Sequence, residues 1–327
     1  MKVLVIGGAG YIGSHMVYTL IRSGYDVVVL DDLSGGHADA VNGAELVIGC
    51  CSDTVLLNEL FRDNDFCAVM HFASFIQVGE STIKPAKYYS NNFCSTMNLL
   101  EAMITAGVKN FIFSSTAAVY GNPIADTICE LHQKLPINPY GRSKWMVEQL
   151  LEDYDNAYGL KSVSLRYFNA AGCAPNSGLG ERHEPETHLI PLVMQTASRR
   201  KENIAVFGTD YATIDGTCVR DYVHVLDICD AHLLAMEYLF KDGQTSQFNL
   251  GNGNGFSVRQ VIDAAVETTG REINVITHPR RVGDPPRLVA DATKAREVLG
   301  WKPSRSHLSL IIEDAWGWER AYPWRRL

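Results

Sequence analysis

Short continuous apolar runs alternate with helical patterns along the first half of the chain. The continuous apolar runs cover residues 3–6 and 27–30, and residues 45–48, 68–73, 110–115 and 162–166 also read as strands. Unbroken apolar runs of this length are typical of parallel strands that are buried on both faces. Between the first two runs, Ile12, Met16 and Leu20 recur at a helical spacing that ends near Gly24. This alternation predicts an α/β fold with a doubly wound parallel sheet.

The second half of the chain has a looser pattern. Beyond roughly residue 170 the strand–helix rhythm weakens, and Pro and Gly become more frequent. We therefore expect a large domain over residues 1–170 and a smaller α/β domain over residues 171–327, with segments that interleave with the first.

A glycine-rich turn follows the first apolar run. Gly7, Gly10 and Gly13 have the spacing G-x-x-G-x-x-G between a strand and a helix, and the next strand ends in Asp31. Bare backbone lets a pyrophosphate approach the helix N-terminus, and the carboxylate can accept hydrogen bonds from a ribose. A glycine-rich turn alone also occurs in other α/β proteins. The order of strand, glycines, helix, strand and acid favours a Rossmann-type site for NAD rather than NADP, because Asp31 would repel a 2′-phosphate.

A helical pattern after residue 138 carries the candidate catalytic residues. Val147, Leu150, Leu151 and Tyr154 recur at i, i+3, i+4 and i+7, which predicts one buried face. Tyr140 and Lys144 lie one turn apart on this helix, so their side chains share a side. A nearby fixed cation favours a phenolate, and a bound nicotinamide cation would add a second positive charge. The Tyr-x-x-x-Lys spacing is common by itself.

Thr116 directly follows the strand predicted over residues 110–115. Ligands of such sheets bind at the carboxyl ends of the strands. We therefore expect Thr116, Tyr140 and Lys144 to meet around one cofactor.

Charge and composition exclude several partners. The chain has 327 residues, a net charge of −8 and 46% hydrophobic residues. This acidic balance argues against nucleic acid or an anionic membrane as a partner. There is no apolar segment of 18 residues, the first apolar run is shorter than we expect of a signal peptide, and the eight Cys form no Cys-x-x-Cys. We expect a cytoplasmic protein with reduced thiols and no membrane association.

The segment from His183 to His188 contains two histidines and two glutamates. The histidines are five residues apart rather than four, and Pro185 would break the helix that a zinc motif of this kind needs. We expect no metal site.

Several segments resemble one family. They are GGAGYIGSH (7–15), HFAS and VGES (71–81), FIFSSTAAVYG (111–121), PYGRSK (139–144), RYFNAAG (166–172) and DGTCVRDYVHVLD (215–227). The chain resembles the extended short-chain dehydrogenase/reductase family and, within it, the UDP-glucose 4-epimerases. The resemblance implies Tyr140 as catalytic base, Lys144 as its electrostatic helper and cofactor ribose ligand, and Thr116 as the hydroxyl partner. It implies NAD as cofactor, bound by Gly7, Gly10, Tyr11, Ile12, Gly13, Asp31, Phe72, Ala73, Asn91, Ser114, Tyr140, Lys144 and Tyr167.

The resemblance also implies a UDP-sugar substrate held mainly by the second half. Arg220 and Arg281 would contact the diphosphate, which suits the paired donors of guanidinium groups. Asn169 would be the other diphosphate contact, Asp284 would meet the uridine ribose, and Phe207 would line the uracil. The full implied set is Thr116, Tyr140, Asn169, His188, Leu189, Ala205, Phe207, Arg220, Arg281, Asp284 and Leu288.

The implied reaction interconverts UDP-glucose and UDP-galactose through a 4-keto sugar and transient NADH. A related alternative is a nucleotide-sugar dehydratase or decarboxylase, but Thr116 is followed by Ala117 and Ala118, where a 4,6-dehydratase usually carries an Asp-Glu pair. A non-catalytic NAD sensor typically loses the Tyr or the Lys. By family analogy we also expect a homodimer that pairs the helices after Ser90 and Tyr140.

Four positions depart from the family pattern. Cys50 replaces an Asp that contacts adenine, Ile76 a basic residue near the pyrophosphate, and His188 an Asn found in some bacterial members. Leu288 stands where a bulky Tyr limits some members to unacetylated sugars. Leucine is intermediate in size, which leaves UDP-N-acetylhexosamines open as further substrates.

Overall fold

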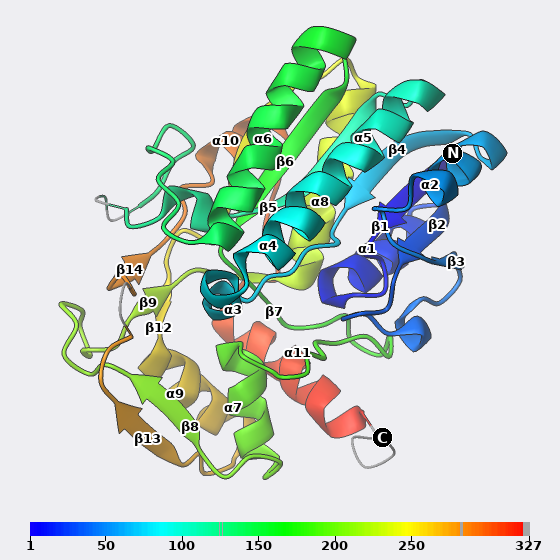
Figure 1. Cartoon of the computed structure of the whole chain (residues 1–327). Coiled ribbons are helices and arrows are strands. Elements are labelled where there is room, and N and C mark those ends of the chain that lie inside the picture. The colour runs from blue at the N-terminus through cyan, green and yellow to red at the C-terminus, as the bar shows by residue number, and fades with distance from the viewer. Residues whose placement is uncertain (124, 126, 282–283, 323–327) are drawn as a thin grey trace.

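A seven-stranded parallel sheet forms the centre of the larger part of the molecule (Figure 1). The computed structural model describes residues 1–123, 125, 127–281 and 284–322. In sheet order the strands are β11 (Ser246–Leu250), β6 (Lys161–Tyr167), β5 (Asn110–Thr116), β4 (Phe66–His71), β1 (Lys2–Ile6), β2 (Asp26–Asp31) and β3 (Glu45–Ile48). The fold class predicted from the apolar runs is confirmed.

Helices cover both faces of this sheet. One face packs against α2 (Thr54–Asp63), α5 (Ser95–Ala106) and α6 (Pro139–Tyr158). The other face packs against α1 (Tyr11–Arg22) and α8 (Val225–Phe240), with α10 (Thr293–Val298) beside β11. Burial on both faces explains why β1 and the centre of β2 are continuously apolar. Val3, Val5 and Val29 belong to the core on the α1 side, and Leu4, Val28 and Leu30 to the core on the α2 side.

A smaller α/β lobe lies beyond the carboxyl ends of the strands (Figure 1). Its core is formed by α7 (Leu189–Ala197), α9 (Val258–Thr269) and α11 (Leu308–Ala321) with β8 (Ile204–Phe207) and β13 (Val275–His278). Short strands complete it: β7 (Asn169–Ala171) pairs with β10 (Tyr222–His224), and β9 (Val219–Arg220) lies between β12 (Phe256–Ser257) and β14 (Arg287–Leu288).

The chain passes between the two parts more than once. After β10 it returns to the large sheet as α8 and β11, and β11 pairs in parallel with β6, whose residues lie 83 positions earlier. The short helices α3 (Val78–Ile83) and α4 (Pro85–Tyr88) and the π-helical turn Tyr89–Cys94 connect β4 to α5. Residues 225–250 therefore pack on the large sheet, although they lie in the second half of the sequence.

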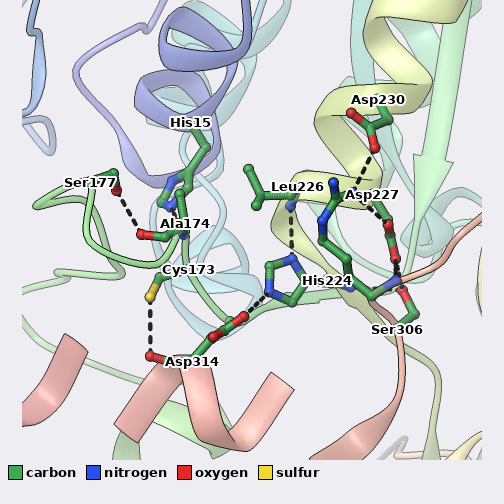
Figure 2. Close-up of polar contacts among 12 residues, drawn as sticks. His15, Cys173, Ala174, Ser177, His224, Leu226, Asp227, Asp230, Ser306 and Asp314 are labelled. Carbon is green, nitrogen blue, oxygen red and sulfur yellow. Dashed lines mark hydrogen bonds and ion pairs between the residues drawn. The ribbon is translucent and has the colours of Figure 1, made fainter. Parts of the chain in front are cut away.

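A set of polar contacts joins the two parts around His224 (Figure 2). The imidazole accepts the Leu226 backbone N–H at Nδ1 (3.1 Å) and donates from Nε2 to the Asp314 carboxylate on α11 (3.0 Å). Cys173 donates from its thiol to the Asp314 carbonyl oxygen at 3.1 Å. On the other side, His15 on α1 accepts the Ala174 N–H at 3.1 Å. The first helix of the sheet and the last helix of the lobe are thus connected through the segment after β7.

Among the described residues, no helix combines the length and the apolar content that crossing a lipid bilayer requires.

Candidate active site

The candidate catalytic helix, α6, begins where local sequence dictates. The Asn138 side chain accepts the Gly141 backbone N–H at 2.8 Å, which caps the helix, and Pro139 takes the first helical position, where its missing N–H costs nothing. Tyr140 and Lys144 follow in the first turns. Lys144 is buried, with 3% of its surface exposed, whereas Tyr140 is half-buried.

Lys144 is held at the carboxyl end of β5. Its ammonium donates to the Ser114 carbonyl oxygen at 2.8 Å and to the Ser74 hydroxyl at 2.6 Å. It also lies 4.6 Å from the centre of the Phe113 ring. Burial lowers the pKa of Lys144 to about 7, with the Glu148 carboxylate acting in the opposite direction. The position of this amine is therefore fixed before any ligand binds.

Tyr140 lies close to Thr116, the third of the predicted catalytic residues. Its side chain shares a hydrogen bond with Thr116, the last residue of β5. Burial raises the pKa of the Tyr140 phenol, and the hydrogen bond with Thr116 acts against this rise. The lowering expected from a neighbouring cation is therefore not a property of the polypeptide alone. Loss of hydration on burial is the larger of the two causes of this shift, and Lys144 is not one of them.

A buried ionic network connects α6 to β6, and the sequence analysis did not predict it. Arg166 on β6 donates to both oxygens of Glu148 on α6, and each side chain is only 3% exposed. The Ser115 hydroxyl donates to Glu148 at 2.5 Å, and Arg166 donates to the Tyr120 hydroxyl at 2.9 Å. Glu148 is one helical turn beyond Lys144, so the sequence already indicated that the two side chains lie on the same side of α6.

The glycine turn between β1 and α1 leaves no room for side chains at two of its predicted positions. A Cβ on Gly7, whose φ is +79°, would lie 2.4 Å from the Ala73 nitrogen, and a Cβ on Gly13 would lie 2.1 Å from the Gly7 carbonyl oxygen. Among the described residues, no side chain caps α1 at Gly10. The first-turn amides of α1, at Tyr11 and Ile12, are thus available for a phosphate, as an NAD site requires.

Asp31 lies at the end of β2, next to this turn. Its carboxylate accepts the backbone N–H groups of Ala9 and Leu33, both at 2.9 Å, and the residue is 8% exposed. Each carboxylate oxygen has a second lone pair for a ribose hydroxyl. The glycine turn and Asp31 therefore fit the adenosine half of NAD.

The other predicted cofactor residues surround the carboxyl ends of β1, β4, β5 and β6. Phe72 and Ala73 follow β4, and both amides donate to the Ile6 carbonyl oxygen. Ser114 and Tyr167 share a short hydrogen bond between their hydroxyl groups. Asn91, in the π-helical turn, donates only to the side chain of its neighbour Asn92, at 3.0 Å, among the contacts described. The strand predicted over residues 68–73 ends at His71, so Phe72 and Ala73 lie in the loop beyond it.

Asn92 and Ser74 were not among the predicted site residues. The Asn92 side chain accepts the Phe75 N–H and donates to the Phe75 carbonyl oxygen and to the Ser143 hydroxyl, which ties the loop after β4 to α6. Ser74 accepts from Lys144. Ser74 lies in the HFAS segment, so that segment was the signal for this loop.

Strand pairing brings three predicted substrate residues together. Leu288 on β14 lies opposite Arg220 on β9, and the Arg220 guanidinium pairs with the Asp284 carboxylate. Leu288 also packs against the apolar cluster of Val119, Tyr120 and Ile128. The predicted diphosphate and ribose contacts are therefore bonded to one another in the protein without ligand.

A second group forms on β8. Phe207 stacks on His278, with ring centres 5.3 Å apart, and the Arg281 guanidinium lies 3.9 Å from the Phe207 ring centre. Ala205 is on the same strand, half-buried. Arg281 and Phe207 were predicted separately, and the parallel pairing of β13 with β8 brings them into contact.

The remaining predicted residues lie where the chain crosses between the two parts. Asn169 begins β7 and donates from its side chain to the Asp221 carbonyl oxygen at 3.0 Å. Leu189 is the first residue of α7. The His188 imidazole is directed at the carboxylates of Glu181 and Glu186, at 2.8 and 3.3 Å.

Comparisons with known proteins agree with this geometry. Residues 3–251 match the model of the NAD dependent epimerase/dehydratase family. A UDP-glucose 4-epimerase of Streptococcus mutans is 50% identical over 326 residues, which cover 99% of this chain and 98% of that protein.

Two solved structures are also similar. The UDP-glucose 4-epimerase of Brucella ovis in complex with NAD has a TM-score of 0.95 and 47% identity, covering 96% of this chain and 97% of that one. The enzyme of Bifidobacterium longum in complex with NAD+ and UDP has a TM-score of 0.92 and 37% identity, covering 99% of both chains. The chain therefore belongs to the NAD dependent epimerase/dehydratase family and, within it, to the UDP-glucose 4-epimerases.

Proposed function

We propose that this chain interconverts UDP-glucose and UDP-galactose by inverting carbon 4 of the sugar. The observation that carries the proposal is the convergence of Thr116, Tyr140 and Lys144 at the carboxyl end of β5, beside the glycine turn. A proton-transferring phenol next to a dinucleotide site is what oxidation of a sugar hydroxyl needs. The reaction returns the same atoms to the same carbon, so the enzyme consumes no reductant.

Tyr140 acts as the general base and then as the general acid. Its phenolate takes the proton of the sugar 4-hydroxyl, and the phenol returns that proton after the sugar has turned its other face. Thr116 orients the phenol through their hydrogen bond, and Lys144 stabilises the phenolate when protonated. NAD+ bound at the glycine turn supplies the hydride acceptor for carbon 4 and the donor that restores it.

Residues of the smaller lobe anchor the nucleotide while the sugar turns. Arg220 and Arg281 bind the diphosphate together with Asn169, Asp284 binds the uridine ribose, and Phe207 lines the uracil. The support is their placement: Arg220 and Asp284 pair across adjacent strands, and Arg281 covers Phe207. Residues 1–170 would hold the cofactor, and residues 171–327 the nucleotide sugar, with α8 and β11 returning to the sheet.

A dehydratase is the weaker alternative. It requires acid and base groups near carbons 5 and 6 of the sugar, and the 3-10 turn after Thr116 begins with Ala117 and Ala118, whose methyl groups transfer no protons.

A second substrate class is favoured by one observation. Leu288, smaller than a tyrosine, lies half-buried opposite Arg220. UDP-N-acetylhexosamines are therefore the further substrates to test.

The active form is a cytoplasmic homodimer in this proposal. Helices α5 and α6 lie together on one face of the sheet (Figure 1), and Met97 on α5 is 37% exposed. Two copies of this helix pair would form a four-helix contact. Light scattering after gel filtration tests it, since a single 36.2 kDa species would contradict the dimer.

The first experiment incubates the purified protein with UDP-galactose and no added cofactor, and measures UDP-glucose. We expect turnover, because NAD should remain bound during purification. UDP-N-acetylgalactosamine is then tested in the same way. Turnover of both substrates would establish dual specificity, and turnover of UDP-galactose alone would show that Leu288 closes the pocket. If neither reacts with NAD added, the epimerase proposal fails, and a search for keto or decarboxylated products follows.

A further inference from the structure

Two histidines and two glutamates converge in the loop that leads into α7. The four residues are Glu181, His183, Glu186 and His188, and one ligand atom from each lies within 4.8 Å of all the others. Both glutamate side chains are almost fully buried, at 7% and 5% exposure. Two carboxylates at such close range need a positive charge between them, which either protonated imidazoles or a bound cation can supply.

The nitrogen–oxygen distances among these four side chains are close to those in a metal coordination shell. His183 Nδ1 lies 3.3 Å from Glu181 Oε1 and 3.4 Å from Glu186 Oε2. His188 Nδ1 lies 2.8 Å from Glu181 Oε1 and 3.3 Å from Glu186 Oε1. In a tetrahedral site with ligands about 2.0–2.1 Å from the metal, neighbouring ligand atoms are about 3.3 Å apart. Three of the four measured distances agree with this edge length.

Each imidazole Nδ1 lies between the two carboxylates rather than against a single one. Both Nδ1 atoms have almost no contact with solvent, yet neither has a partner of hydrogen-bonding geometry among the described residues. Buried polar atoms of this kind are rare in proteins. The Glu186 carboxylate is already oriented, because its Oε1 accepts the backbone N–H groups of Thr187 (2.7 Å) and His188 (2.8 Å). Such outer contacts are typical of metal-bound carboxylates.

We propose that Glu181, His183, Glu186 and His188 bind one divalent transition metal ion, of which Zn²⁺ fits the ligand set best. Imidazole nitrogen and carboxylate oxygen are both zinc ligands, and Mg²⁺ or Ca²⁺ would not select two imidazoles. Four protein ligands fill a tetrahedral shell, which makes the site structural rather than catalytic. The two carboxylates neutralise the ion when the imidazoles are neutral.

This proposal reverses the expectation drawn from the sequence. That expectation compared the segment with a helical motif, in which two histidines must be four residues apart. Here the ligands lie in a loop, where spacing is set by the path of the backbone, and Glu181 supplies a ligand from outside the segment 183–188. Pro185 is no obstacle in a loop.

The position of the site gives the ion a positioning role. His188 immediately precedes Leu189, the first residue of α7. The His183 ring packs edge-on against Tyr11, with ring centres 6.4 Å apart, and the Tyr11 hydroxyl donates to the Gly172 carbonyl oxygen at 2.6 Å. A bound ion would therefore fix the loop between the cofactor turn and the nucleotide-binding lobe.

The test measures metal content and stability rather than activity. The full-length protein is stripped with a chelator, incubated with Zn²⁺, passed through gel filtration and analysed by mass spectrometry for metal. We expect about one Zn²⁺ per chain in the wild type and in a His307→Gln control, whose histidine is exposed. His183→Gln and Glu186→Gln should retain less than a tenth of this amount. Zn²⁺ should raise the thermal unfolding midpoint of the stripped wild type and leave both variants unchanged.

Two results would overturn the proposal. One is a stripped wild type that takes up no more Zn²⁺ than His183→Gln. The other is full retention of Zn²⁺ by both variants, which would place the ion elsewhere, for example on thiols. If the variants do not fold, the visible spectrum of the Co²⁺-loaded wild type tests whether the ion is bound in a four-coordinate site without thiolate ligands. Strong four-coordinate bands without a thiolate charge-transfer band support the site, and their absence contradicts it.

Discussion

The Lys144 ammonium donates a hydrogen bond to the Ser114 carbonyl oxygen at 2.8 Å, which joins the catalytic helix α6 to the carboxyl end of β5. Ser114 lies one residue beyond Phe113, the last residue of β5 that pairs with β4. Lys144 binds its carbonyl oxygen and is thereby held in a fixed place. Thr116, two residues beyond Ser114, interacts with Tyr140 through its side chain. The spacing between phenol and amine is thus set by the sheet as well as by the helix.

Replacing Tyr140 by Phe should abolish most turnover and leave the fold intact. The change removes one oxygen, the atom that exchanges the substrate proton, and general acid–base catalysis contributes about 10²–10⁴-fold. We expect the rate of UDP-glucose formation from UDP-galactose to fall by at least about 100-fold, with bound NAD retained. Tyr158→Phe, an exposed tyrosine on the same helix, is the matched control and should keep wild-type activity. Equal rates for both variants would remove Tyr140 from the mechanism.

Breaking the buried ion pair below α6 should cost stability. Glu148→Gln leaves the Arg166 guanidinium without its carboxylate in a site where both side chains are 3% exposed. Removing one partner of such a pair typically costs about 3–5 kcal/mol in the free energy of unfolding. Asp155→Asn, which breaks the more exposed pair with Lys161 near the end of α6, should cost less than about 1 kcal/mol. Urea denaturation measures both, and a similar loss in the two variants would contradict the assigned importance of burial.

Acid should destabilise the protein partly through His71. Burial lowers the pKa of His71 from 6.5 to about 3, with a smaller contribution from Lys144, while Nε2 shares a hydrogen bond with Thr96 at 2.8 Å. Below pH 6.5 the unfolded chain binds a proton at this residue and the folded chain does not, so stability is lost as the pH falls toward 3.

Between pH 6 and 4.5 the wild type should therefore lose about 2 kcal/mol more than His71→Gln, measured by urea denaturation at each pH. His307→Gln, an exposed histidine, should follow the wild type. If the free energy of unfolding fell equally with pH in the wild type and in His71→Gln, His71 would not contribute to the acid sensitivity.

Removing the guanidinium of Arg281 should weaken substrate binding more than chemistry. Arg281→Gln takes away the charge proposed for the diphosphate and its contact with the Phe207 ring. We expect KM for UDP-galactose to rise at least about tenfold, since one charged hydrogen bond contributes about 1.5–3 kcal/mol, with a smaller change in kcat. Arg280→Gln is the neighbouring control, because Arg280 pairs with the exposed Asp210. A loss of kcat at unchanged KM would argue against the anchoring role.

Local patterns in the sequence were enough to predict much of this protein. Apolar and strand-like segments predicted six strands of the large sheet, because strands buried on both faces are rich in apolar residues. The spacing of Tyr140 and Lys144 followed from helical geometry, and the glycines at 7 and 13 from the close approach of the backbone. Each of these features depends on residues within a few turns of one another.

Tertiary structure alone decided the rest, because the deciding contacts join distant parts of the chain. The strand β11 enters the sheet next to β6 after more than 80 residues, and its sequence has no continuous apolar run. Arg220 meets Asp284 across 64 positions only because β9 and β14 pair. Burial, which no linear pattern measures, reversed the expected direction of the Tyr140 pKa in the polypeptide. The path of the loop brings Glu181 close to His183, Glu186 and His188. Residues in a loop have no regular spacing from which this could be predicted.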